Sequence, residues 1–257
     1  MHHDYALGKA YSSNPLHCLI MNTPTHELFL YTYMSKTNLP PVKVAVLIDG
    51  GFFVKRFNSL YNQDRRMSGA DVAKHLYTMA HKHVGSNNIL YRIFYYDCHP
   101  LSKKAHNPIS GRPIDFSKTP ESKFREELLE ELKRMRKVAL RIGTLKDNNN
   151  WHLYPKVVKK LLARDMSVDD LTENDVYMEI RQKGVDMKIG VDITSLALKK
   201  FVDTIVLFSG DSDFVPAAKL ARREGIDFIL DPMFANVESQ LFEHVDGMRS
   251  VKPTFRK

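Results

Sequence analysis

Cysteine is nearly absent from this sequence, with two residues, Cys18 and Cys98, among 257. Two thiols form neither a disulfide framework nor a cysteine-based zinc site, and they are typical of a reducing cytoplasm. No apolar run approaches the roughly 18 residues needed to span a bilayer. The N-terminus lacks a basic patch followed by a clean apolar segment, so we expect no signal peptide.

The motifs of several enzyme classes are also missing. No nucleophilic serine or cysteine motif occurs. Gly50 and Gly51, followed by Phe52, do not supply the Gly-x-Gly-x-x-Gly turn of a dinucleotide-binding enzyme. A haloacid-dehalogenase-like phosphatase needs a second aspartate two residues after its nucleophilic one. The run Asp49-Gly50-Gly51 lacks that second acid, so we rank this class last.

Acidic residues are not in excess either. The chain has 38 Lys and Arg against 30 Asp and Glu, a net charge of +8. Cations placed on phosphates release condensed counterions, so this balance favours a polyanionic partner. The net charge alone is equally consistent with a basic protein that is merely soluble. The hydrophobic content of 43% suffices for a sizeable core.

Three regions follow from the composition along the chain. Residues 1–41 mix polar and aromatic residues without periodicity, and we interpret them as a mobile or loosely packed extension. Within them, Leu28 to Tyr33 has the pattern of a short edge strand. Residues 42–250 form the expected domain, and residues 251–257 form a C-terminal tail.

The expected domain alternates strands with helices, which predicts βαβ units, a parallel sheet and an α/β fold. Residues 98–120 read as a long loop and residues 147–151 as a turn. The expected strands are 44–48, 89–96, 138–145, 176–183, 204–208 and 226–230. The expected helices are 52–60, 70–84, 121–136, 154–163, 187–200, 214–223 and 237–245.

Aspartates follow two of the buried strands. Asp49 comes directly after the first, and Asp211 and Asp213 come after the strand at 204–208. Ligands of an open parallel sheet bind beyond the carboxyl ends of its strands, so these acids are expected to converge. Asp186 precedes the helix at 187–200. Asp192 lies about 240° away from it on an ideal helix, which makes Asp192 the weaker candidate.

Clustered carboxylates repel one another, and a hard cation such as Mg²⁺ or Mn²⁺ relieves that repulsion. Such an ion orients water and stabilises charge on a phosphodiester. Some of these acids also have an ordinary structural interpretation. Asp49 before two glycines is also a turn residue, and Asp213 is also a helix cap. Asp97 and Asp231 read as turn acids.

Three ordered blocks resemble the NYN domain, the LabA-like branch of the PIN-like nucleases. They are residues 44–53 (VAVLIDGGFF), 183–192 (KGVDMKIGVD) and 209–216 (SGDSDFVP). The resemblance implies a Rossmann-like PIN fold with a central parallel sheet flanked by helices. It also implies an endoribonuclease dependent on Mg²⁺ or Mn²⁺, with Asp49, Asp186 and Asp211 as catalytic and metal-binding acids and Asp192 and Asp213 as additional ones.

One departure bears on catalysis. Many relatives have Asn shortly after the Asp-Gly of the first block, where this chain has Gly51 and Phe52. A catalytically weak or inactive PIN-like module that binds RNA or a protein is therefore the alternative function. RNA, single-stranded or structured, is the expected partner, while DNA and a homodimer stay open. The expected substrate-binding residues are Lys183, Lys188, Lys55 and Ser209.

Overall fold

The computed structural model describes residues 40–64 and 66–255. The extension expected at residues 1–41, with its strand at Leu28 to Tyr33, lies outside this part except for its last two residues. From Val42 onward the chain forms one compact unit. Among the described residues, no helix is long and apolar enough to cross a membrane.

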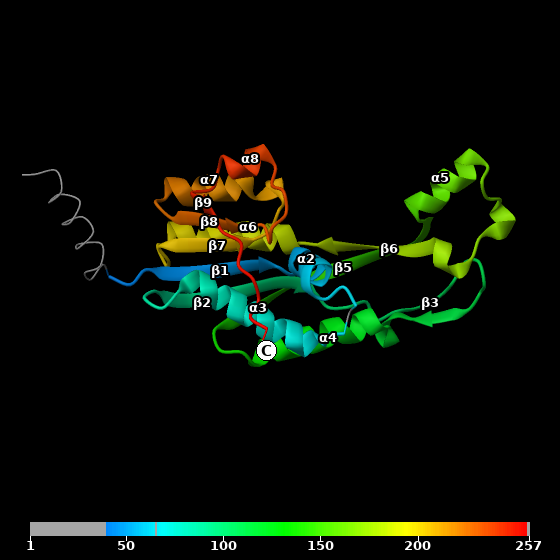
Figure 1. Ribbon diagram of the computed structural model, residues 1–257, viewed down its shortest axis with the longest axis horizontal. Coiled ribbons are helices and arrows are strands. Elements are labelled where there is room, and N and C mark those ends of the chain that lie inside the picture. Colours follow the sequence, from blue (N-terminus) through cyan, green and yellow to red (C-terminus); the bar gives the residue numbers. More distant parts are fainter. Residues whose placement is uncertain (1–39, 65, 256–257) are drawn as a thin grey trace, which may run out of the picture. The chain divides into compact units, whose positions relative to one another are not determined.

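A seven-stranded sheet in the order β6-β5-β2-β1-β7-β8-β9 organises this unit (Figure 1). Strand β1 lies at its centre and pairs in parallel with β2 and β7, while β5 and β6 pair antiparallel. The predicted α/β fold with a mostly parallel sheet is confirmed, and it is consistent with a PIN-like fold. The strands are β1 (Lys43–Asp49), β2 (Ile89–Cys98), β3 (Lys104–His106), β4 (Pro113–Asp115), β5 (Val138–Leu153), β6 (Val176–Lys183), β7 (Thr204–Phe208), β8 (Asp227–Asp231) and β9 (Gly247–Met248).

Helices cover both faces of the sheet. Helices α2, α3 and α4 pack on one face, and α6, α7 and α8 pack on the other. The α-helices are α2 (Gly50–Tyr61), α3 (Gly69–Val84), α4 (Pro120–Arg134), α5 (Pro155–Ala163), α6 (Val185–Leu198), α7 (Val215–Arg223) and α8 (Ser239–Phe242). The 3-10 helices are η1 (Phe116–Lys118), η2 (Val168–Asp170), η3 (Glu173–Asp175) and η4 (Ser212–Phe214).

The apolar run of β1 explains why it is central. Successive side chains of a strand point to opposite faces, so a strand buried on both faces needs a continuous apolar run. Val44, Val46 and Ile48 enter the core under α2, α3 and α4. Ala45 and Leu47 enter the core under α6 and α7. The carboxyl end of β1 is therefore held from both sides.

Strand β5 is longer than the sequence predicts, and the turn expected at residues 147–151 is wrong. The first half of β5 pairs with β2, and the second half pairs with β6 from Thr144 opposite Lys183 to Leu153 opposite Val176. The register shifts between Asp147 and Trp151. Pairing with a partner strand keeps this polar stretch extended, although its composition favours a turn.

Two further segments differ from expectation. The loop expected at residues 98–120 contains the β3–β4 hairpin and η1, and the helix expected at residues 237–245 is limited to α8. In the stretch assigned to the tail, Val251 is buried and its N–H bonds to Asp231. The ring of Phe255 lies 4.9 Å from that of His75.

Candidate active site

Asp49 ends the central strand and begins α2. Its Oδ1 accepts a hydrogen bond of 3.1 Å from the N–H of Phe52, so the side chain caps the helix. Gly50 makes this turn feasible, because a Cβ there would lie 2.6 Å from the Tyr95 ring and 2.7 Å from a backbone oxygen. The tight turn holds Asp49 at the carboxyl edge of the sheet.

The environment of Asp49 resists ionisation. Its pKa is raised to about 6, mainly by burial and further by the negative charges of Asp186 and Asp97. The bond from the Phe52 N–H works in the opposite direction. Among the described residues, no Lys, Arg or His forms an ion pair with Asp49. Backbone N–H groups, and no cationic side chain among these residues, thus offset the repulsion from the neighbouring acids.

Asp186 stands in the first turn of α6. The helix follows Gly184, whose φ of 79° is left-handed and suits glycine. The pKa of Asp186 is raised by burial first, then by Asp211 and by Asp213. The two acids that follow β7 therefore raise the pKa of Asp186, and the charge of Asp186 raises the pKa of Asp49.

The loop after β7 carries these two acids. Oδ1 of Asp211 accepts a 2.9 Å bond from the N–H of Asp213, and the N–H of Asp211 donates to the hydroxyl of buried Ser209. A Cβ on Gly210 would lie 3.1 Å from the Phe52 ring, so this loop packs against the first turn of α2. The loops after β1 and β7 are therefore neighbours.

These contacts place Asp49, Asp186, Asp211 and Asp213 around one edge of the sheet. Asp192 has different partners, because Tyr96 donates its hydroxyl to Oδ2 of Asp192 at 2.8 Å and Arg141 Nε donates at 2.9 Å. This ion pair satisfies the Asp192 carboxylate on the face of the sheet under α6.

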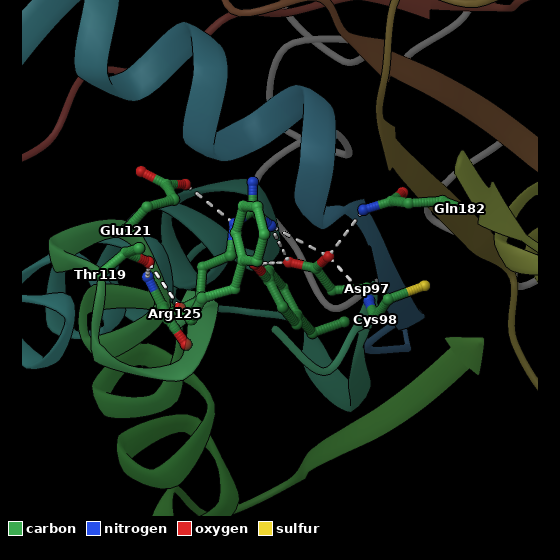
Figure 2. Close-up of polar contacts among 9 residues, drawn as sticks. Asp97, Cys98, Thr119, Glu121, Arg125 and Gln182 are labelled. Carbon is green, nitrogen blue, oxygen red and sulfur yellow. Dashed lines mark hydrogen bonds and ion pairs between the residues drawn. The ribbon is translucent and has the colours of Figure 1, made fainter. Parts of the chain in front are cut away.

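Asp97, which the sequence suggests is a turn acid, has a structural role at this edge that is more extensive than a turn. It is the second-last residue of β2, as Asp49 is the last residue of β1, yet it is 1% exposed and fully bonded. It accepts from the hydroxyl of Tyr95 at 3.0 Å and from Gln182 Nε2 at 3.0 Å. Nη1 of Arg125 lies 3.1 and 2.9 Å from its two oxygens (Figure 2). The Arg125 partner, 28 residues away on α4, gave no signal in the sequence.

Asp231, at the end of β8, is likewise fully engaged. Its Oδ2 lies 2.8 Å from Nε2 of His83, and both side chains are fully buried. Its Oδ1 accepts the N–H of Met233 at 2.8 Å. Asp97 and Asp231 therefore serve the structure of the edge, whereas the four acids named above have no cationic partner among the described residues.

The predicted substrate-binding residues lie in different settings. Lys183 ends β6 beside Lys146 of β5, and the pKa of the Lys183 ammonium is lowered by that neighbour. Lys188 is exposed on α6. Lys55 borders a cavity of about 480 Å³ next to α2. Ser209 is fully buried and bonds to its own loop, so it shapes the position of Asp211.

Within residues 40–64 and 66–255, no group of three or more Asp, Glu, His or Cys side chains lies close enough to hold a metal ion. The chemistry of the donors is nevertheless that of a hard cation. The four acids are oxygen ligands with repulsive charges, and Mg²⁺ is usually held by one or two carboxylates with water completing its shell. The donor set thus fits a cation held by few protein ligands.

Comparison with protein families adds to this geometry. The model of the NYN domain matches residues 114–243, just over half of the chain. The match includes Asp186, Asp192, Asp211 and Asp213, and it begins after Asp49. No curated protein matches the chain.

Two solved structures share weak likeness with it. One is a protein of unknown function from Vibrio parahaemolyticus, with 13% identity over 84% of this chain and 96% of that chain and a TM-score of 0.43. The other comes from a study of the mechanism and regulation of Sir2 enzymes, with 11% identity, coverage of 82% and 87%, and a TM-score of 0.32. Neither likeness supports a conclusion about this chain.

Proposed function

Because the chain belongs to the NYN domain family, within the PIN-like nuclease superfamily, we propose that it is a metal-dependent endoribonuclease of the LabA-like branch. Its substrate is the phosphodiester bond of RNA. The two cysteines, of which Cys98 is a buried free thiol, support a reducing cytoplasm as its compartment.

One observation carries this proposal: four acids of the carboxyl edge repel one another while the others are paired. Asp97, Asp192 and Asp231 each have an arginine or histidine partner. Asp49 and Asp186 instead have raised pKa values, in part because acids face them. A fold that retains unpaired carboxylates at the ligand-binding edge of its sheet keeps them for a ligand.

Asp49, Asp186 and Asp211 are the acids that would supply the one or two direct ligands of Mg²⁺ or Mn²⁺, with the remaining acids, Asp213 among them, contacting the ion through water. Such an ion supplies Lewis-acid chemistry, polarising a phosphoryl oxygen and lowering the pKa of bound water. With a pKa of about 6, the Asp49 carboxylate is mostly ionised at neutral pH and takes a proton more readily than an ordinary aspartate does. Where Asp49 contacts the ion through water rather than directly, its carboxylate would accept the proton that the attacking water loses.

The basic residues around this edge bind the RNA backbone. Lys146 and Lys183 lie side by side without a carboxylate partner among the described residues, so together they attract an anion. Lys55 and Lys188, both exposed, extend the positive charge onto α2 and α6. Each lysine that meets a phosphate releases a counterion, so binding weakens with salt.

The test is cleavage of a labelled RNA by the full chain with Mg²⁺ or Mn²⁺. We expect cleavage that EDTA stops and that Asp211→Asn lowers by at least about a hundredfold, as for loss of a group that stabilises the transition state. Asp169→Asn, at an exposed acid of η2, is the matched control and keeps full activity. A DNA strand of the same sequence measures the preference for RNA.

The binding module is the second candidate, and a specific observation favours it: the described acids do not form a ready three-ligand group. Salt-sensitive RNA binding without cleavage under any divalent cation would replace the nuclease with this module. Cleavage that persists in EDTA and in Asp211→Asn would come from a contaminant and would remove support for the enzyme.

A further inference from the structure

A second feature of the carboxyl edge is a cavity of about 460 Å³ beside Asp97. The loop after β2 contributes His99 and Leu101 to its lining, η1 contributes Phe116, and the β5–β6 hairpin contributes Leu145 and Ile180. Arg125 and Gln182, which both donate to Asp97 (Figure 2), belong to its polar lining together with Thr119, Glu121 and Ser122. Its size and its apolar lining with a few polar groups are typical of a small-ligand site.

A buried hydroxyl in this cavity has no partner. Ser122 of α4 lines the cavity and is 4% exposed, and its Oγ forms no hydrogen bond among the described residues. Buried polar atoms are nearly always bonded, because an unmet hydrogen bond destabilises the folded protein. This hydroxyl is covered in the structure, so a ligand with a polar edge would satisfy it once the Ser122 side chain rotates toward the cavity.

The charges around the cavity disfavour an anion. Arg125 is the one lysine or arginine among the described residues of its lining, and it is already bound to Asp97 and to Glu121, at 2.9 and 3.0 Å. One positive charge between two carboxylates leaves no net attraction for a phosphate. A neutral ring with apolar faces and a polar edge suits this lining better.

The cavity adjoins the candidate active site through Gln182. Its Nε2 bonds to Asp97, and its Oε1 lies 3.6 Å from where a Cβ on Gly51 would be. That same Cβ position lies 3.5 Å from Oδ1 of Asp49. A ligand that contacts Gln182 in the cavity therefore lies next to the residues that flank Asp49.

From these observations we propose that the cavity binds one nucleobase of the RNA strand, adjacent to the phosphodiester bond held at the carboxylates. This assignment rests on the proposed function for its substrate class. The base stacks against the apolar and aromatic lining, as unstacked bases of single strands do, and its polar edge bonds to Ser122. The strand is then single-stranded at this position, since a paired base cannot enter.

Binding of small probes tests the cavity separately from hydrolysis. Equilibrium dialysis in EDTA compares the four ribonucleoside 5′-monophosphates with ribose 5-phosphate, which lacks only the base. We expect at least one nucleotide to bind about tenfold or more tightly than ribose 5-phosphate, given the usual gain from stacking one base. Equal binding of all five probes by the intact protein would overturn the proposal.

Two substitutions locate the binding. Ile180→Trp fills the cavity and is expected to remove the preference for nucleotides, whereas Leu162→Trp, at an exposed aliphatic residue of α5, retains it. Ser122→Ala is expected to weaken nucleotide binding about threefold to tenfold, the usual loss of one hydrogen bond, without lowering the melting temperature. Unchanged nucleotide affinity in both Ile180→Trp and Ser122→Ala would place the base elsewhere and refute the assignment.

The two proposals fail in different ways. Base-dependent binding with no RNA cleavage under any divalent cation would support the cavity and reject the nuclease. Cleavage of RNA with equal rates for an intact strand and for one lacking each base in turn would support the nuclease and reject the cavity.

Discussion

Nη1 of Arg125 lies 3.1 Å from Oδ1 and 2.9 Å from Oδ2 of Asp97. Asp49 has no such ion pair with a cationic side chain among the described residues. Both acids end neighbouring parallel strands. One is neutralised by a cation and three further donors, and the other faces additional acids. The difference separates a structural carboxylate from a candidate catalytic one.

Asp97→Asn is expected to lower the free energy of unfolding by about 2–4 kcal/mol, because it leaves the partly buried guanidinium of Arg125 with Glu121 as its remaining charged partner. Urea denaturation followed by circular dichroism measures the change. Asp169→Asn, at an exposed position, serves as the control and should unfold like the unmodified chain. Equal stability of all three proteins would contradict the structural role of Asp97.

Asp49→Asn is expected to stabilise the metal-free protein at pH 7.5 by roughly 1–2 kcal/mol, while it abolishes activity. The pKa of Asp49 rises from 3.8 to about 6 on folding, so the folded state binds more protons between these values. Stability therefore falls as pH rises through this window, and the loss is complete above it. Asn retains the cap on α2 and removes the charge.

The measurement is urea denaturation of both proteins in EDTA at pH 7.5 and pH 4. The advantage of Asp49→Asn should shrink at pH 4, where the aspartate is protonated when folded. An advantage of the same size at both pH values would show that the charge is not its cause.

Magnesium is expected to raise the melting temperature of the intact chain, since a ligand that binds only the folded state stabilises it by mass action. Asp186→Asn removes a carboxylate that faces Asp211 and Asp213 and should abolish most of that rise. Differential scanning fluorimetry with Mg²⁺ titrated into EDTA-treated protein measures both. A rise of equal size in Asp186→Asn would exclude this residue as a ligand.

Lys146→Gln and Lys183→Gln are expected to weaken RNA binding and to lower the slope of log affinity against log salt by about 0.7 for each lysine removed. Fluorescence anisotropy with single-stranded RNA at several salt concentrations gives the slope. Lys74→Gln, which removes an exposed lysine paired with Asp71 on α3, is the control. An unchanged slope in the double variant would remove these lysines from the RNA-binding surface.

Gly50→Ala and Gly51→Ala are expected to differ sharply in stability. A Cβ at Gly50 would overlap backbone and the Tyr95 ring at 2.6–2.7 Å, so we expect a loss of about 3 kcal/mol or more. A Cβ at Gly51 meets only ordinary contacts from 3.5 Å outward, so this variant should fold normally. Thermal melts compare them, and equal stability would contradict the tight turn.

The sequence predicted most of the fold because β1 and β7 are short apolar runs whose period and flanking helices are unambiguous. It predicted the strand at 138–145 but missed its continuation, since the polar residues near Asp147 become extended only by pairing with β6. Pairing across the chain is not encoded in local composition.

The same limit applies to the candidate site. Asp49, Asp186 and Asp211 are candidates from the sequence because each stands beside a strand end or a helix start. Asp97 has an equally prominent position, and only its contact with Arg125 shows that it is neutralised. Spacing reveals which acids share an edge, and partners distant in sequence decide which of them keep an unbalanced charge.

The two ends of the β5–β6 hairpin differ in what they contact. Its base carries Lys146, Lys183 and Gln182, the last of which donates to Asp97, while its far end carries α5, where Val157 is buried. The far end rests on the β3–β4 hairpin through Asn107, which donates to the carbonyl of Glu173. Insertions and deletions between residues 154 and 175 would therefore reshape the far end of the hairpin while leaving the residues at its base in place.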